Sequence, residues 1–426
     1  MVAPSAKHIV VIGAGAAGLM AAHELSRAGC KVTILEAQDR CGGRILPLSE
    51  AQFGYPAEGA AEFIHGEAPV TRALMHEAGL SLLPINGTRW TSENGTFSDQ
   101  ERDAFDEPAL HHALKTLQHD LPLAEFLRRH FSGPAHARMR ASIQRMVEGY
   151  DAADPERIST FAIRDEWMTG DHATGGRVDG GYGRLIGFLV ARCRDHGVDI
   201  RTAAVVTAIE TVDGGVTVRC ADGAAHEGDA AILTVPIPLL PTIAVPAATQ
   251  PIVNDTVRKG FGNVIKVLLK FERRWWADDP RLRDMTFLLS DDTGAAFRVW
   301  WTQFPDESPV LTGWLGGPTT QALADCDEDQ LVAAAVASLA SIFKRPVADL
   351  RQQLVSARAF DWSKHPFARG AYSYAVPEPH DASTTPESGP VYLAGEALYR
   401  GRDMGTVEAA LASGLHTAKV ILKSRS

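Results

Sequence analysis

Three glycines near the start of the chain have the spacing of a phosphate-binding turn. Gly13, Gly15 and Gly18 form a G-x-G-x-x-G pattern directly after an apolar run that is typical of a buried strand. The first glycine permits a tight turn, the second lets a pyrophosphate approach the backbone, and the third lets the following helix pack against the strand. Ala16 and Ala17 begin that helix, whose N–H groups and positive dipole end stabilise anions. The pattern predicts a dinucleotide site.

A carboxylate follows about twenty residues beyond these glycines. The apolar run 31–35 predicts a second parallel strand, which delivers Glu36 and Ala37 to the edge of the sheet that carries the turn. A carboxylate at this place accepts hydrogen bonds from the ribose hydroxyls of adenosine and repels a 2′-phosphate. The strand, turn, helix, second strand and acid therefore favour FAD or NAD over NADP.

A second glycine pair distinguishes FAD from NAD. It stands between two arginines in the stretch Arg40, Cys41, Gly42, Gly43 and Arg44. The glycines and both arginines can close over the pyrophosphate from the side opposite the first turn. We expect Arg44 to make the charge-assisted contact, and FAD is the expected cofactor.

The stretch LEAQDRCGGR resembles the fingerprint of the flavin-containing amine oxidases, a family that includes monoamine oxidases, polyamine oxidases and lysine-specific histone demethylases. The resemblance covers essentially the whole chain, and its loop pattern is nearest to polyamine oxidase-like members. It implies an α/β fold in which a discontinuous, Rossmann-like FAD-binding domain carries an inserted α+β substrate-binding domain. The implied FAD-binding domain comprises 1–78, 177–245 and 386–426, and the substrate-binding domain comprises 79–176 and 246–385.

The same resemblance implies further cofactor contacts in segments far apart in the sequence. The loop 57–66 would line the cofactor, the segment near 206 would touch adenine through its backbone, and the last strand and helix start would hold the ribityl chain and the pyrimidine ring. These implied contacts are Gly59, Ala60, Ala61, Glu62, Val206, Pro236, Trp362, Gly395, Glu396, Thr406 and Val407.

Lys266 stands in the middle of an alternating apolar pattern that predicts a strand. Val264 and Leu268 share its face, so it does not resemble an ordinary surface lysine. Burying an ammonium without a partner costs several kcal/mol, which suggests a lysine held for function. The resemblance implies that Lys266 is the family's catalytic lysine, which positions a water at flavin N5 and supplies positive charge when the cofactor reacts with oxygen.

Tyr372 is the second expected catalytic residue, because the family places an aromatic ring at this position against the flavin face, where it orients the amine. Tyr374 shares its face in an extended segment and is the reserve candidate, although a packing role suits it better. Ala371 stands where monoamine oxidases have the cysteine that tethers the flavin, so the FAD is expected to be noncovalent. Arg402 replaces their second cage tyrosine; its guanidinium would repel a charged amine or grip a carboxylate.

The substrate itself is left open among primary amines, polyamines and amino acids. Glu62 lies where polyamine oxidases place polar tunnel residues, so we expect it either to pair with a distal ammonium or to be a solvated loop acid. His65, in the same loop, is more typical of a structural residue than of a base. An amino acid substrate would need an arginine that binds its carboxylate. The resemblance places Arg402 beside the site, whereas nothing in the sequence places Arg164 or Arg177 there.

The expected reaction is oxidation of a C–N bond. A hydride passes from the amine α-carbon to flavin N5, the resulting imine hydrolyses to an aldehyde or ketone, and O2 takes up the electrons to give hydrogen peroxide. One alternative is a desaturase or dehydrogenase that acts on C–C bonds of an apolar substrate, and Lys266 and Tyr372 weigh against it. The other is a noncatalytic flavin-binding scaffold.

Composition narrows the class of protein further. The chain has 426 residues with 45% hydrophobic residues, which suffices for about two domains. Its net charge of −10 argues against nucleic acid and anionic membranes as partners. The five cysteines are scattered and include no C-x-x-C pair, so the expected compartment is the cytoplasm, with no disulfide framework. A homodimer is compatible with the sequence, which carries no signal for oligomeric state.

The elements around these motifs follow from periodicity. Residues 80–176 are expected to form a helical layer at the entrance to the site, because leucines recur there at helical spacing. Strands are expected at 198–209 and 230–235. The histidines of the helical layer form no compact ligand set with acids or thiols, so we expect no metal site.

Overall fold

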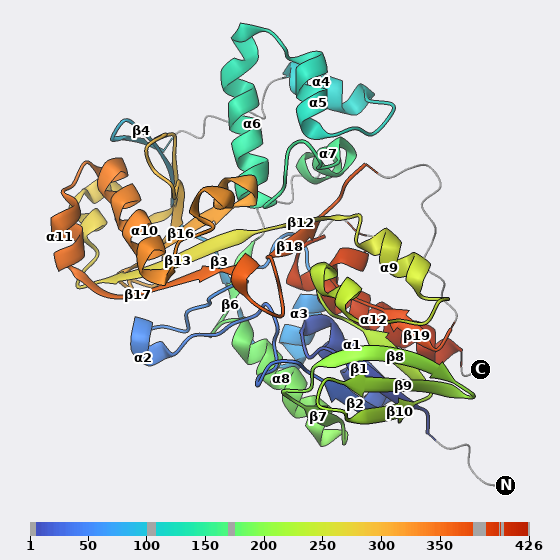
Figure 1. Cartoon of the computed structure of the whole chain (residues 1–426). Coiled ribbons are helices and arrows are strands. Elements are labelled where there is room, and N and C mark those ends of the chain that lie inside the picture. The colour runs from blue at the N-terminus through green and yellow to red at the C-terminus, as the bar shows by residue number, and fades with distance from the viewer. Residues whose placement is uncertain are drawn as a thin grey trace.

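The structure is a computed structural model that describes residues 6–99, 108–168, 175–377, 389–399, 401 and 404–424 (Figure 1). A five-stranded sheet and a seven-stranded sheet dominate it, with a layer of helices above them. Among the described helices, none combines the length and the apolar character that crossing a membrane requires. No disulfide links the five cysteines, all of which lie in this part of the chain.

The five-stranded sheet is parallel throughout and carries the glycine turn. Its strand order is β19-β11-β1-β2-β7, and its strands come from three separate stretches of the chain, as the resemblance implies. The strands are β1 (His8–Ile12), β2 (Lys31–Leu35), β7 (Asp199–Arg201), β11 (Ala230–Leu233) and β19 (Val391–Leu393). Their near-continuous burial is what a parallel sheet with both faces covered requires.

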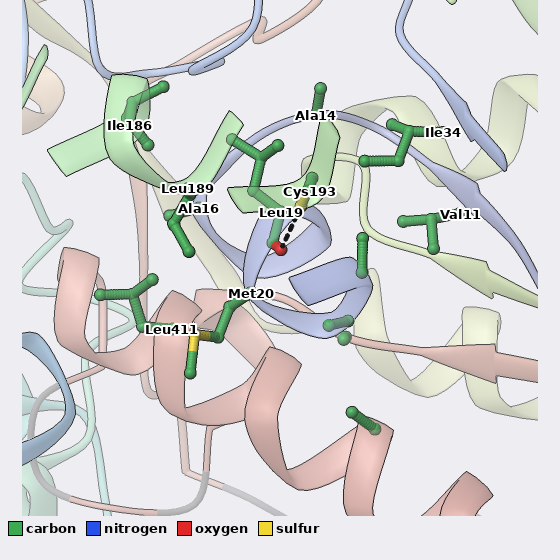
Figure 2. Close-up of a cluster of buried hydrophobic side chains, with 14 of the residues drawn as sticks. Val11, Ala14, Ala16, Leu19, Met20, Ile34, Ile186, Leu189, Cys193 and Leu411 are labelled. Carbon is green, nitrogen blue, oxygen red and sulfur yellow. Dashed lines mark hydrogen bonds between the residues drawn. The ribbon is translucent and has the colours of Figure 1, made fainter. Parts of the chain in front are cut away.

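Helices cover one face of this sheet. They are α1 (Ala16–Arg27), α3 (Pro69–Glu77), α8 (Tyr182–Asp195) and α12 (Val407–Lys423). Figure 2 shows their core, to which α1 contributes Leu19 and α12 contributes Leu411, and in which the Cys193 thiol reaches the Leu19 carbonyl at 3.6 Å. A Cβ at Gly414 would lie 2.2 Å from the Ala17 carbonyl oxygen, so α12 can approach α1 this closely only with glycine there.

A smaller antiparallel sheet covers the other face. It consists of β8 (Val206–Val212), β9 (Gly215–Cys220) and β10 (Ala225–Gly228), followed by α9 (Gln250–Thr256). Val10 and Val218 share its core. The expected strand 198–209 is wrong as a single element: it divides into β7 and β8, which belong to different sheets. The expected strand 230–235 ends earlier, at Leu233.

The seven-stranded sheet supports Lys266. Its order is β17-β13-β16-β15-β14-β4-β5, and α10 (Glu328–Phe343) and α11 (Val347–Gln352) pack beside it. Strand β13, which lies between β17 and β16, is almost wholly buried. The strands are β4 (Thr88–Glu93), β5 (Thr96–Ser98), β13 (Val264–Phe271), β14 (Met285–Ser290), β15 (Val299–Trp301), β16 (Val310–Gly316) and β17 (Leu354–Asp361).

Short elements complete the fold. Two strand pairs join distant segments, and one of them presents Tyr372. These elements are α2 (Glu50–Phe53), β3 (Leu82–Pro84) with β6 (Gly176–Val178), β12 (Gly260–Gly262) with β18 (Tyr372–Tyr374), and 3₁₀ turns at Pro134–His136, Ile237–Thr242, Trp275–Asp278, Pro280–Leu282, Gly317–Leu323, Trp362–Lys364 and Glu396–Leu398.

The helical layer consists of α4 (Pro108–Thr116), α5 (Leu123–His130), α6 (Ala137–Tyr150) and α7 (Thr160–Trp167), and stands at the top of Figure 1. The expectation that this layer begins at residue 80 is wrong, since β3, β4 and β5 occupy that part of the chain. The reason is tertiary: β4 pairs in parallel with β14, about 200 residues away along the chain, and Trp90 packs into that sheet's core.

Candidate active site

One large cavity runs from the glycine turn to the helical layer. Its volume is ≈ 2340 Å³, against roughly 300–1,000 Å³ for pockets that hold one small molecule, so it has room for a dinucleotide and a second ligand. We call the part lined by Gly15, Glu36 and Val206 the glycine end. The part lined by Glu62 and Tyr372, in front of Lys266, is the lysine end.

The glycine turn has the geometry that a pyrophosphate needs. Gly13 has a φ of +105°, which favours glycine, and a Cβ at Gly18 would lie 2.0 Å from the Gly13 carbonyl oxygen. By contrast, a Cβ at Gly15 would meet no atom within 4 Å, because Gly15 faces the cavity. Gly15 is also the N-cap of α1 and offers no side-chain cap, so the first N–H groups of that helix are left for a ligand.

Glu36 stands at the end of β2 with both carboxylate oxygens fixed. The backbone N–H of Ala14 donates to Oε2 at 2.7 Å, and that of Gln38 donates to Oε1 at 2.9 Å. The residue is 5% exposed, and burial raises the pKa of its carboxyl. It lines the cavity together with Ala37, in the place where the ribose of a dinucleotide is expected.

The two arginines of the second glycine pair differ in position. Arg44 lines the cavity and donates to the Glu396 carboxylate at 2.8 Å and to the Ala371 carbonyl at 2.7 Å. Arg40 does not line the cavity: its guanidinium donates to the carbonyls of Ile45 at 2.9 Å and Gly43 at 2.8 Å. Arg40 thus shapes the loop in this structure, and its contact with the cofactor stays a prediction.

The other predicted cofactor residues fall into two groups. Gly18 and Gly59 do not line the cavity; they permit close packing, since a Cβ at Gly59 would lie 2.9 Å from the Leu46 side chain. The Gly59 carbonyl accepts a bond of 3.2 Å from the Trp362 indole. The residues that do line the cavity are Gly13, Ala16, Ala17, Gly42, Gly43, Ala60, Ala61, Glu62, Val206, Pro236, Trp362, Gly395, Glu396, Thr406 and Val407.

Lys266 is fully buried in β13 and paired. Its Nζ donates to Glu62 Oε2 at 2.8 Å and to the Ala60 carbonyl at 3.0 Å. The ammonium also lies 5.3 Å from the centroid of the Trp301 ring, within cation–π range. Lys266 itself stands behind Ala60 and Glu62, which line the cavity. Its contact with a flavin-bound water therefore stays a prediction.

Glu62 accepts hydrogen bonds from four side chains. Besides Lys266, Arg177 Nε donates at 2.9 Å, Gln303 Nε2 at 3.0 Å and the Trp301 indole at 3.1 Å. Burial would raise the pKa of the Glu62 carboxyl, but the charges of Lys266 and Arg177 outweigh it and hold that pKa at about 2. Glu62 is therefore not a solvated loop acid, and its partners do not favour the predicted pairing with a substrate ammonium.

Tyr372 stands in β18 at the lysine end. Its hydroxyl donates to the Tyr150 carbonyl at 2.7 Å, and its ring lies against Gly405, where a Cβ would be 3.1 Å from Cδ2. Burial raises the pKa of the Tyr372 hydroxyl well above its usual value, so it stays neutral. Tyr374 also lines the cavity, and its ring lies over Gly260 within the core of the helical layer. Arg402 lies outside the described residues.

Sequence reasoning missed a pair of acids at the outer wall of the lysine end. Asp151, just after α6, and Glu166, in α7, both line the cavity and interact through their carboxyl groups. Burial, and then the charge of Glu166, raise the pKa of Asp151 well above its usual range. The fourteen residues between them, 152–165, contain no recognisable motif, so nothing in the sequence indicated the pair.

The two other arginines considered as a carboxylate clamp lie elsewhere, and sequence reasoning missed the buried acid Glu58. Arg177 is committed to Glu62 and to the Thr302 carbonyl, at 3.0 Å, while Arg164 lies outside the cavity lining, beside Asp165. Neither arrangement favours a clamp for a substrate carboxylate.

Glu58, in the loop before Glu62, is 4% exposed, and burial raises the pKa of its carboxyl to about 7. Its neighbours in sequence, glycine and alanine, gave no sign of this environment.

The residues at the cavity fit an FAD. The open space at Gly15 lets a pyrophosphate approach the backbone, and the uncapped start of α1 offers it N–H donors. Glu36 is an acceptor for a ribose, and Arg44, which is bound to Glu396, is a further donor at the cavity. The Ala371 side chain that lines the cavity offers no nucleophile for a covalent link. In the described part of the chain, no three His, Cys, Asp or Glu side chains gather as a metal site.

Comparisons with known proteins agree with this geometry. Residues 16–422 match the family described as flavin containing amine oxidoreductase. The chain is 27% identical to lysine-specific histone demethylase 2 of Homo sapiens over 455 residues, which cover 97% of this chain and 53% of the relative. It is 26% identical to polyamine oxidase 4 of Oryza sativa subsp. japonica over 463 residues, with 96% and 87% coverage.

Solved structures show the same fold. A putrescine oxidase with bound putrescine has a TM-score of 0.79 and 19% identity, covering 98% of this chain and 99% of the other. Cyclohexylamine oxidase from Brevibacterium oxydans IH-35A has a TM-score of 0.80 and 20% identity, with 99% coverage of both chains. The chain thus spans the full length of these oxidases but about half the length of the demethylases it matches.

Proposed function

Because the chain belongs to the flavin-containing amine oxidoreductase family, we propose that it is an FAD-dependent amine oxidase that uses O2 as electron acceptor. The substrate is a small primary amine or a polyamine. It loses a hydride from its α-carbon, and the imine hydrolyses to an aldehyde or ketone with release of the amine nitrogen. O2 accepts the two electrons and becomes hydrogen peroxide.

One observation carries this proposal: a buried lysine stands directly behind the wall of the same cavity end that an aromatic side chain, Tyr372, lines. Val264, two residues before Lys266 on β13, packs in the same apolar cluster as Tyr372. Bound FAD supplies the acceptor for the hydride. The protein binds and orients the amine beside Tyr372, excludes bulk water, and places the positive charge of Lys266 near the reacting end.

The relatives and the cavity support an amine as substrate. The structural relatives are named for oxidation of putrescine and of cyclohexylamine, and a sequence relative for oxidation of polyamines. Asp151 and Glu166 line the wall near Tyr372, and neither can supply the positive charge that a substrate carboxylate would need there. We therefore rank amino acids below amines as substrates, and noncovalent FAD is part of the proposal.

The test is an anaerobic titration of the purified holoprotein with mono-, di- and polyamines and with amino acids, followed in the visible flavin band. Bleaching by an amine, with peroxide formed when O2 is readmitted, is the expected result. Bleaching by an amino acid alone would overturn the choice of substrate. A yellow protein that no amine bleaches would favour a C–C desaturase or dehydrogenase, or a noncatalytic flavoprotein.

A further inference from the structure

A buried carboxylate controls where the amino group of Lys266 lies. The Lys266 side chain is 0% exposed and that of Glu62 is 7% exposed. Of the acceptors that Lys266 Nζ reaches, the Ala60 carbonyl is neutral and the Glu62 carboxylate carries charge. Since an ammonium without a counter-charge is costly to bury, the charged state of Lys266 depends on Glu62.

Glu62 is in turn held from its other oxygen. Arg177, in β6, donates to Oε1 and is anchored by a second bond to the Thr302 carbonyl, and Gln303 donates to the same oxygen. The Arg177 guanidinium also lies 4.6 Å from the centroid of the Phe63 ring. Because separate elements fix both oxygens, the carboxylate cannot turn away from Lys266 without breaking several bonds.

The charges in this group do not cancel. Lys266 and Arg177 are two cations and Glu62 is one anion, so the group carries one net positive charge. Glu62 stays ionised because its two cationic neighbours keep its pKa at about 2. The group stands behind the cavity wall formed by Ala60 and Glu62, at the end that Trp362 and Tyr372 line.

We propose that Glu62, anchored by Arg177, is the positioning residue that keeps the Lys266 amino group charged and fixed at the reacting end of the cavity. This inference rests on the proposed function, in which Lys266 supplies charge there. The Glu62–Arg177 support is inferred from the ion pairs of this chain's own residues.

The test compares Glu62→Gln and Glu62→Asp. The holoprotein is reduced with dithionite, so that no amine is needed, and its reoxidation by O2 is followed at pH 6 to 10. The wild-type rate should stay within about twofold between pH 7 and pH 9. In Glu62→Gln, Lys266 faces Arg177 without a carboxylate and loses its proton more readily, so the rate should fall about tenfold over the same range. A second readout is the midpoint potential of bound FAD.

Glu62→Asp keeps the charge but is one methylene shorter. The rate of flavin reoxidation in Glu62→Asp should be lower than in wild type but should not change with pH. The Lys266 ammonium stays charged, but the shorter carboxylate draws it away from the reacting end of the cavity. This variant also serves if Glu62→Gln does not fold. A rate and potential equal to wild type in Glu62→Asp, or a flat and wild-type profile in Glu62→Gln, would overturn the proposal.

Two controls separate positioning from general effects. Glu408→Gln changes another buried carboxylate, which accepts bonds from Val70 and Thr71 and does not line the cavity, and should leave the pH profile unchanged. Glu58→Gln controls for a nearby carboxyl with a pKa near 7, on which both Lys266 and Glu62 act. The buried Tyr55 hydroxyl, whose pKa is raised by burial and then by the charge of Glu62, is a further titratable neighbour. Failure of the proposed function would appear separately, as a wild-type protein that no amine bleaches.

Discussion

The two ends of the cavity bind by different physical means. The glycine end uses backbone: the start of α1, glycines that admit close approach, and one acid, Glu36, held by backbone N–H groups. The lysine end uses side chains, including the buried charges of Lys266, Glu62 and Arg177, which come from β13, the loop 57–66 and β6. The first end should therefore respond to changes of backbone space, and the second to changes of charge and pH.

The largest expected effect tests the charge at the lysine end. Lys266→Met keeps a long apolar stem but removes the ammonium, and oxidative turnover with an amine should fall about a thousandfold. The FAD should stay bound and yellow, because the glycine end is untouched. Steady-state peroxide formation and the visible spectrum measure the two results. A loss of FAD together with activity would mean that the two ends are not independent.

A pair of alanine substitutions tests the glycine end. Gly18→Ala places a Cβ 2.0 Å from the Gly13 carbonyl oxygen and should lower the free energy of unfolding by about 3 kcal/mol. Gly15→Ala meets no atom within 4 Å and should leave the apoprotein's stability unchanged, yet weaken FAD binding because it occupies ligand space. Chemical denaturation of the apoprotein and FAD titration check this. Equal stability losses in both variants would refute the assignment of Gly15 to the ligand.

The sequence predicted the glycine end well because its information is local. Gly13, Gly15, Gly18 and Glu36 follow one another in a single strand–turn–helix–strand unit, and β2 has the predicted bounds. Arg40 shows the limit even here, since spacing could not tell a contact with the loop from one with the ligand.

The lysine end was only partly predictable, because its partners come from distant segments. The apolar flanks of Lys266 indicated burial, but nothing in the sequence linked it to Glu62, 204 residues away, or Glu62 to Arg177, 115 residues away. The acids Asp151 and Glu166 belong to a helical layer without a motif. Interactions between residues so far apart in the sequence can be identified only from the folded structure, which brings the segments together.

Glu58→Gln tests the buried carboxyl near the lysine end through the pH dependence of the free energy of unfolding. Burial raises the pKa of the Glu58 carboxyl from 4.5 to about 7, so the folded protein holds a proton that the unfolded chain has lost. Stability from this group is complete below pH 4.5, is lost as pH rises toward 7, and changes no further above it. Between pH 5 and pH 8, wild type should lose about 2 kcal/mol more than Glu58→Gln. Urea denaturation across this range measures it; parallel curves would contradict the assignment.

The smallest effect is expected where the lysine end uses a ring instead of a charge. Tyr372→Phe removes only the hydroxyl bond to the Tyr150 carbonyl, worth about 1 kcal/mol, and should change the rate of anaerobic bleaching by an amine less than tenfold. Tyr372→Ala removes the ring that orients the amine and should slow bleaching much more. Because neither variant alters charge, both should keep the wild-type pH profile of reoxidation. If Tyr372→Phe slowed bleaching as much as Tyr372→Ala, the hydroxyl and its bond to Tyr150 would be the orienting element, and the ring would only fill space.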